Sequence, residues 1–186
     1  GWRIFATFCS FAAFGVGGLL LRLLVFPMLP WLARDGDHRK RLARGLVQRA
    51  FACHIELMRR LGVLTYEIQG IDRLHRNGLL VLANHPTLID VVFLISLLPN
   101  ADCVIKPSVA RNIFMRGPAR AAGYVSRDEG AGLVDDCIAT VRSGACLVIF
   151  PEGTRTSPGQ RIRLQRGAAN IAVRGGLAIS LVRFTW

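Results

Sequence analysis

The sequence predicts an α/β protein with a mostly parallel central sheet flanked by helices, preceded by an N-terminal helical module that anchors the chain in a membrane. Three observations lead to this prediction. The chain begins with a long apolar run, a basic segment with helical periodicity follows, and from residue 62 short apolar runs alternate with helix-like stretches. Such alternation is typical of domains built around a parallel sheet. We therefore predict a membrane-anchoring module over residues 1–60 and an α/β domain over residues 61–186.

The N-terminal apolar run is long enough to cross a bilayer. No charge interrupts the eighteen residues from Ile4 to Leu21, which as a helix would measure about 27 Å, close to the hydrocarbon thickness. Pro27 and Pro30 disfavour a second full span, so we expect Leu23–Ala33 to be re-entrant or interfacial. A secretory signal peptide and a buried core helix are the competing interpretations, but the run follows a single basic residue and lacks a clear cleavage site.

A basic segment follows the apolar run. Arginine and lysine are dense from Arg34 to Arg60, and apolar residues recur there at helical spacing, which predicts a basic amphipathic helix. Basic residues beside a membrane segment mark its cytoplasmic side. We therefore expect the following domain to face the cytoplasm, and a location in a bacterial inner membrane fits this arrangement.

The composition is both apolar and basic. Hydrophobic residues make up 52% of the 186 positions, and the formal net charge is +12. Nucleic-acid binders of this charge are usually hydrophilic and interleave aromatic with basic residues, so we expect membrane lipids and no nucleic acid as partners. An arginine-rich genome is the alternative source of the charge. The five scattered cysteines predict reduced thiols and no metal site.

The remainder of the chain predicts alternating strands and helices. Strands are expected at Leu64–Gln69, Leu79–Ala83, Cys103–Lys106, Gly123–Arg127, Cys146–Phe150 and Leu177–Val182. Helices are expected at Leu88–Leu98, Ser108–Ala122, Gly132–Ser143 and Gln165–Gly175.

A histidine and an aspartate follow the second of these strands. In the segment Asn84-His85-Pro86-Thr87-Leu88-Ile89-Asp90, Pro86 predicts a turn before the helix begins. Such a turn would let the Asp90 carboxylate orient the His85 imidazole, leaving its other nitrogen to deprotonate a hydroxyl group. A histidine and an aspartate five residues apart are common, so this spacing alone is weak.

Two further polar segments end predicted strands. Phe150-Pro151-Glu152-Gly153-Thr154-Arg155 contains a proline that ends the strand, a glycine that permits close backbone approach, and an arginine suited to phosphate oxygens. Gly123-Tyr124-Val125-Ser126-Arg127 also ends in an arginine. The carboxyl ends of parallel strands are where open α/β sheets place their sites.

Together and in this order, these segments resemble the glycerolipid acyltransferases of the lysophosphatidate acyltransferase family. The family pattern N-H-x-x-x-x-D is matched by Asn84, His85 and Asp90, and F-P-E-G-T-R is matched without change by Phe150 to Arg155. A looser glycine-to-arginine block corresponds to Gly123–Arg127, and a fourth, apolar block corresponds to Ala178–Val182. The resemblance covers Leu64 to Val182.

This resemblance implies a reaction and a role for each residue. A fatty acyl group would pass from acyl-CoA or acyl carrier protein to a hydroxyl of a lysophospholipid such as 1-acylglycerol-3-phosphate, with His85 as general base and Asp90 orienting it. The residues expected to bind substrate are Asn84, Lys106, Arg127, Glu152, Gly153, Thr154 and Arg155. No metal or resident cofactor is implied. Apolar grooves between the N-terminal module and the catalytic domain would accept acyl chains.

Three departures from the family pattern concern the acceptor and the chain end. Ser126 stands where aspartate is frequent, and Ser180 where proline is frequent. The chain stops at Trp186, directly after the fourth block, where family members usually continue. Missing sequence at a truncated C-terminal end and an unusually short family member are the two interpretations. The acceptor, the donor, the acyl length and the oligomeric state stay open.

Other activities fit the sequence less well. A thioesterase could use the same histidine and aspartate, but water needs no anion-binding turn; release of free fatty acid without acceptor would identify it. No G-x-S-x-G, Walker A or G-x-G-x-x-G sequence is present. An acceptor other than a glycerolipid, such as an amino-acid lipid, and a lipid-binding protein without turnover are the remaining alternatives.

Overall fold

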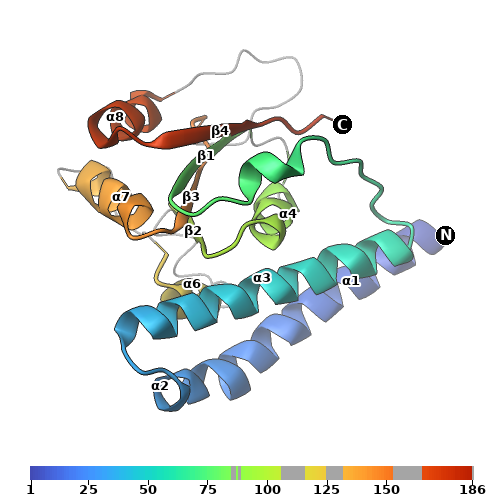
Figure 1. Cartoon of the computed structure of the whole chain (residues 1–186). Coiled ribbons are helices and arrows are strands. Elements are labelled where there is room, and N and C mark those ends of the chain that lie inside the picture. The colour runs from blue at the N-terminus through green and yellow to red at the C-terminus, as the bar shows by residue number, and fades with distance from the viewer. Residues whose placement is uncertain (85–86, 88, 106–115, 125–131, 153–164, 186) are drawn as a thin grey trace.

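A computed structural model gives the fold of the chain (Figure 1) and describes residues 1–84, 87, 89–105, 116–124, 132–152 and 165–185. Its N-terminal helical stretch runs from Trp2 to Leu32 and is long and apolar enough to cross a membrane. The stretch comprises helix α1 (Trp2–Leu20), a π-helical turn η1 (Leu21–Val25), a 3-10 turn η2 (Phe26–Met28) and helix α2 (Leu29–Leu32).

The two prolines of this stretch do not interrupt it. Each lies within the first two positions of a short helix, η2 or α2, where a backbone N–H has no intrahelical partner. The changes of helix type near Pro27 and Pro30 therefore bend the path without ending it. The chain leaves the helical stretch only at Ala33, whose backbone is extended.

Helix α3 (Gly36–Arg60) is the basic amphipathic helix predicted from the sequence. The Asp35 carboxylate caps the start of the helix by accepting a hydrogen bond from the backbone N–H of His38 at 2.7 Å. Arg59 and Arg60 lie in the last turn, where positive charges are attracted by the negative end of the helix dipole. Its buried side includes Val47, Phe51, Ile55 and Met58, a spacing of four, four and three residues that defines one face.

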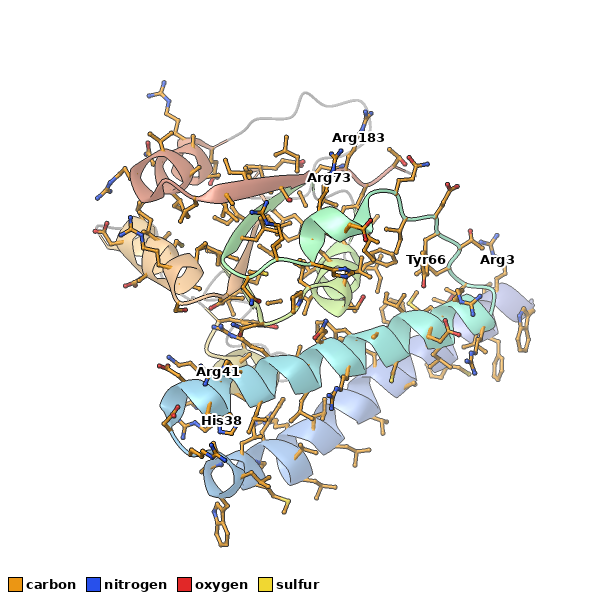
Figure 2. The ribbon with its side chains drawn as sticks, in the orientation of Figure 1. Arg3, His38, Arg41, Tyr66, Arg73 and Arg183 are labelled. Carbon is orange, nitrogen blue, oxygen red and sulfur yellow. The ribbon has the colours of Figure 1, made fainter. Side chains whose placement is uncertain are left out.

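Helices α1 and α3 lie side by side and antiparallel (Figure 1). The Trp2 indole N–H donates to the carbonyl of Leu61, just beyond the end of α3, at 3.3 Å. Halfway along, the Phe14 ring lies 5.9 Å from the Phe51 ring and 4.9 Å from the His54 ring. Arg3 accordingly lies at one end of the pair and His38 at the other (Figure 2).

Four parallel strands form the sheet in the described part of the chain. They are β1 (Leu79–Ala83), β2 (Ala101–Cys103), β3 (Cys146–Ile149) and β4 (Ala178–Val182), in the spatial order β2-β3-β1-β4. Strand β1 is central: Leu82 is opposite Ile149 of β3 on one side and Leu181 of β4 on the other. The predicted mostly parallel sheet is therefore confirmed.

Helices cover both faces of this sheet. They are α4 (Ile89–Leu97), α6 (Arg116–Ala122), α7 (Leu133–Arg142) and α8 (Arg166–Gly175), with a 3-10 turn η3 (Ile71–Leu74) before β1. Val81 packs in a core with residues of α3, α4 and α6, whereas its neighbour Leu80 packs with residues of α7 and α8. Successive residues of a strand point to opposite faces, so the fold has three layers (Figure 1).

The predicted strand Leu64–Gln69 is wrong: it is not a strand in the structure. Val63 and Leu64 both donate backbone N–H groups to the carbonyl of Met58, so this segment first wraps the end of α3. Gly62 allows the wrap through a positive φ of 70°. The residues from Thr65 to Gly70 that follow are exposed and show no strand pairing.

Two other predicted strands have different starting points. Strand β2 begins at Ala101, two residues before the predicted Cys103, and Val104 still donates its N–H to Val148 of β3 at 3.4 Å. Gly123 is a turn residue with φ +65° that follows helix α6, so the strand predicted for Gly123–Arg127 does not begin there. Residues 125–127 lie outside the described part.

Candidate functional site

Two of the segments singled out in the sequence follow neighbouring strands at the same edge of the sheet. Asn84 comes directly after β1, and Phe150 directly after β3. Because β1 and β3 are parallel and Leu82 lies opposite Ile149, both segments leave the sheet at the carboxyl edge. Open α/β sheets bind their ligands at this edge.

Asp90 lies in the first turn of α4 and is fully buried, with 0% of its surface exposed. Its two carboxylate oxygens accept hydrogen bonds from Thr87: one from the backbone N–H and one from the hydroxyl, both at 2.6 Å. Bonds from an N–H and an O–H to the two oxygens of a carboxylate fix its orientation. His85 lies outside the described residues, so its pairing with Asp90 stays a prediction.

Thr87 is a functional residue that the sequence analysis missed. A signal was available, because Thr87-x-x-Asp90 matches the capping-box pattern of a hydroxyl residue followed three positions later by an acidic one. In the structure the acidic side chain reaches back to the N–H of the hydroxyl residue, as in that box. Thr87 therefore holds the Asp90 carboxylate at the start of α4.

Asn84, which was expected to bind substrate, has backbone partners for its side chain in the structure. Its side-chain amide donates to the carbonyl of Phe184 at 3.0 Å, and its side-chain oxygen accepts the Phe184 N–H at 2.7 Å. The carboxamide thus binds the backbone that follows β4. Asn84 and Phe184 are 100 residues apart in the sequence, and no local pattern could have revealed their contact.

Four residues of the segment Phe150–Arg155 were expected to bind substrate, and Glu152 is the one that the structure describes. Its side chain is buried, with 8% exposed. The carbonyl of the preceding residue, Pro151, accepts the backbone N–H of Gln165 at 2.7 Å, so the start of α8 lies beside the end of β3. The other expected substrate-binding residues lie outside the described part of the chain: Lys106, Arg127, Gly153, Thr154 and Arg155.

Three aromatic rings lie next to the carboxyl edge. The Phe93 ring of α4 is 4.8 Å from the Tyr66 ring and 6.1 Å from the Phe184 ring, edge-on to both. Edge-on rings at these separations attract each other. Phe93 is three residues beyond Asp90, so the row links α4 to the segment after β4 and to the chain before η3.

A buried ion pair lies behind the site and was also missed. Arg44 of α3 pairs with Asp102 of β2, and both are buried. Arg44 lies in the segment predicted to be a basic amphipathic helix, and nothing in the pattern distinguished it as buried. Burial and the nearby Asp102 carboxylate raise the pKa of the Cys103 thiol to about 12, and burial raises the pKa of the Tyr124 hydroxyl. These groups are therefore neutral at physiological pH.

An apolar groove lies within the N-terminal module. It has a volume of about 420 Å³ and is lined by residues of α1, η1 and α3, among them Phe14, Phe51 and His54. The sequence analysis expected acyl grooves between this module and the catalytic domain. The groove described here lies between α1 and α3 instead.

A family comparison matches most of the α/β part of the chain. Residues 65–183 match the model of the family described as Acyltransferase. This range contains the four strands of the described sheet and the segments that begin at Asn84 and at Phe150.

Individual relatives extend the match toward the N-terminus. The chain is 26% identical over 185 residues to the 1-acyl-sn-glycerol-3-phosphate acyltransferase of Pseudomonas aeruginosa, a match that covers 95% of the chain and 67% of that protein. Among solved structures, the 1-acyl-sn-glycerophosphate acyltransferase PlsC of Thermotoga maritima superposes with a TM-score of 0.68 at 18% identity. That superposition covers 95% of the chain and 73% of PlsC, so the N-terminal helices share its fold.

Proposed function

Since the chain belongs to the acyltransferase family, we propose that it transfers a fatty acyl group from an acyl thioester to a hydroxyl group of a lysophospholipid such as 1-acylglycerol-3-phosphate. One structural observation carries the proposal. The segment that begins with Asn84 and the segment that begins with Phe150 leave adjacent parallel strands at one edge of the sheet. The relative from Pseudomonas aeruginosa, which is named for this acceptor, supports the choice of substrate.

In the proposed reaction His85 is the general base. It takes the proton of the acceptor hydroxyl as the oxygen attacks the thioester carbonyl, forming the new ester bond. The carbon–sulfur bond then breaks, and the protonated His85 imidazole gives its proton to the leaving thiolate, which departs as the thiol. Asp90 orients the imidazole, and its fixed geometry supports this role: it is buried and both oxygens are held by Thr87. No covalent acyl-enzyme is needed.

The acceptor's phosphate would be bound by cationic residues of the segments Gly123–Arg127 and Phe150–Arg155. We assign Arg127 and Arg155, together with Lys106, to its oxygens, and Gly153 and Thr154 to the turn that approaches it. Arginine forms two parallel hydrogen bonds with phosphate oxygens. Glu152, which is buried at the end of β3, would hold this turn in place. The acyl donor is a substrate, either acyl-CoA or an acyl group carried on acyl carrier protein.

We further propose that α1 lies along the membrane surface with its apolar side in the lipid. Phe5, Phe8, Phe11 and Trp31 are among many large apolar side chains exposed along residues 2–32. At its start and its middle α1 is held to α3 through Trp2 and Phe14. Helix α3 exposes five arginines: Arg39, Arg41, Arg49, Arg59 and Arg60. Carrying these charges through the bilayer would be costly, whereas at the surface they meet anionic lipids.

The test is an acyl-transfer assay with the full chain in lipid vesicles. Labelled acyl-CoA or acyl carrier protein would be supplied with 1-acylglycerol-3-phosphate, and diacyl product measured for wild type and for His85→Ala. Product from the wild type alone would support both the reaction and the base. Release of free fatty acid without acceptor would identify a thioesterase instead, and no turnover with either donor would contradict the proposed substrate.

The phosphate contact has its own test. Arg155→Ala is expected to raise the acceptor KM about tenfold or more while leaving the donor KM unchanged, because a charged hydrogen bond contributes roughly 1.5–3 kcal/mol. Arg166→Ala, at an exposed position near the start of α8, is the matched control. An unchanged acceptor KM in Arg155→Ala would remove the residue from the phosphate site.

A further inference from the structure

Asn84 joins the ends of two neighbouring strands. Ala83 is the last residue of β1 and pairs with Val182, the last residue of β4. One residue beyond the end of β1, the contact with the β4 chain continues through the Asn84 side chain. Its carboxamide presents a donor and an acceptor side by side, and these pair with the backbone C=O and N–H of Phe184.

These two hydrogen bonds use specific atoms of the Asn84 side chain. The Phe184 N–H can only donate, so it fixes the position of Oδ1, and the Phe184 carbonyl can only accept, so it fixes Nδ2. The distances of 2.7 and 3.0 Å are those of good hydrogen bonds. The interaction therefore holds the Asn84 amide in one orientation.

The residue that Asn84 binds also touches the other side of the catalytic segment. The Phe184 ring packs edge-on against Phe93 of α4, three residues beyond Asp90. The segment after β4 thus contacts the chain immediately before His85 and again after Asp90. Both ends of the stretch from residue 84 to residue 93 are fixed on the same support.

We infer that Asn84 is a positioning residue that sets the backbone position of His85 through Phe184, and that it does not bind substrate. This inference rests on the proposed function, in which His85 is the base. Asn84 precedes His85 directly in the chain, so a loss of the Phe184 contact would free the end of β1 where the histidine begins. A misplacement of about 1 Å can lower a rate by about 100-fold.

The test compares rate constants for Asn84→Asp, Asn84→Ala and the wild type in vesicles. Asn84→Asp keeps an acceptor for the Phe184 N–H but places a carboxylate against the Phe184 carbonyl. We expect kcat to fall roughly 10- to 100-fold in both variants, with the KM values for acceptor and donor within about twofold of wild type. A raised acceptor KM with unchanged kcat would overturn the inference and assign Asn84 to substrate binding.

The control is the same substitution at the opposite end of β1. Asn77 is exposed and lies just before the strand, so Asn77→Asp makes the same chemical change without touching the edge that carries the site. It is expected to leave kcat and both KM values unchanged. A fall in kcat equal to that of Asn84→Asp would attribute the effect to a general loss of sheet stability and overturn the inference.

A second experiment tests the route through Phe184. Phe184→Pro removes the backbone N–H that Asn84 accepts. If Asn84 acts through this contact, the double variant Asn84→Ala/Phe184→Pro should lose no more activity than the worse single variant. Additive losses would show that Asn84 acts elsewhere and would overturn the inference. Should Phe184→Pro not fold, Asn84→Asp alone still decides the question through its kcat and KM values.

A third readout is independent of turnover. The chain has four histidines, so the imidazole NMR signal of His85 can be assigned as the one missing from His85→Ala. We expect Asn84→Asp to shift this signal and Asn77→Asp to leave it in place. An unmoved His85 signal in Asn84→Asp would overturn the inference. A shifted signal in a protein that transfers no acyl group would instead indicate that the proposed function is wrong and the positioning contact real.

Discussion

Arg44 of α3 and Asp102 of β2 form a buried ion pair that joins the N-terminal module to the sheet. The same guanidinium donates through Nε to the carbonyl of Ala122 at 2.9 Å and through Nη1 to Oδ1 of Asn100 at 3.1 Å. One side chain thus contacts the start of β2, its preceding turn and the end of α6. The fork geometry of arginine makes three such contacts possible at once.

Loss of the arginine should be strongly destabilising. Arg44→Met leaves the Asp102 carboxylate buried without its cation, which should lower the free energy of unfolding by about 3–5 kcal/mol. Arg41→Met, at an exposed position on the same helix, should change it by less than about 0.5 kcal/mol. Chemical denaturation in detergent measures both. If Arg44→Met lowered the free energy of unfolding as little as Arg41→Met does, water would have to reach the Asp102 carboxylate, and the pair would not be buried in solution.

Replacing Thr87 should slow the reaction without weakening substrate binding. Thr87→Val removes the hydroxyl that donates to Asp90 at 2.6 Å and nearly preserves the side-chain volume. We expect kcat to fall about tenfold, since a hydrogen bond to a charged group contributes roughly 1.5–3 kcal/mol. Thr87→Ser keeps the hydroxyl and should retain most activity. Steady-state kinetics decide, and an active Thr87→Val with an inactive Thr87→Ser would contradict this role.

His54 should make the protein less stable in mild acid. Burial between α1 and α3 lowers the pKa of its imidazole from the usual value near 6.5. Above pH 6.5 the residue is neutral in both the folded and unfolded chain and has no effect. As the pH falls below 6.5, the unfolded chain binds the proton more readily, so stability is lost.

The measurement is the unfolding free energy at pH 7.5 and pH 5 for the wild type and His54→Leu. The wild type should lose more stability between these values than the variant, because the variant has no imidazole to protonate there. His75→Leu, at an exposed position, should behave like the wild type. Identical pH dependence in His54→Leu and the wild type would exclude His54 as the source.

The thiols should differ in reactivity with alkylating reagents. Burial raises the pKa of Cys103 to about 12 and that of Cys137 to about 11, so few of their thiolates exist at pH 7.5 and the reagent cannot reach them. Cys53 is exposed on α3 and should be alkylated first. Mass spectrometry of the native protein after brief treatment gives the order. Early modification of Cys137 would mean that α7 does not stay packed on the sheet.

Local sequence patterns were sufficient to predict the bounds of elements that are well buried in the α/β core. Strand β1 has the predicted bounds, Leu79–Ala83, because this apolar run is enclosed on both faces. Helices α4, α7 and α8 lie within one residue of their predicted ends, since glycines and apolar periodicity mark them. The segment Leu64–Gln69 has a similar local pattern but finds no strand partner, which is a tertiary property.

The site was predictable as a set of motifs but not as a set of contacts. Asp90 was singled out by the match to the family pattern N-H-x-x-x-x-D, and its support by Thr87 was available from the capping pattern. The partner of Asn84 was not, because Phe184 is brought to it only when β4 pairs with β1. Arg44 was predicted only as part of a basic amphipathic helix, since a sequence does not distinguish the one buried arginine of the helix from its exposed neighbours.

The position of α3 has a kinetic consequence. This helix packs against α1 on one side, while Ile55 and Met58 share a cluster with Ile89 and Phe93 of α4, the helix that carries Asp90. The reaction centre would therefore stay at a fixed height above the lipid plane and encounter its acceptor by two-dimensional diffusion. Turnover is expected to follow the surface mole fraction of lysophospholipid, so adding inert detergent at constant total substrate should slow the enzyme by dilution within the surface.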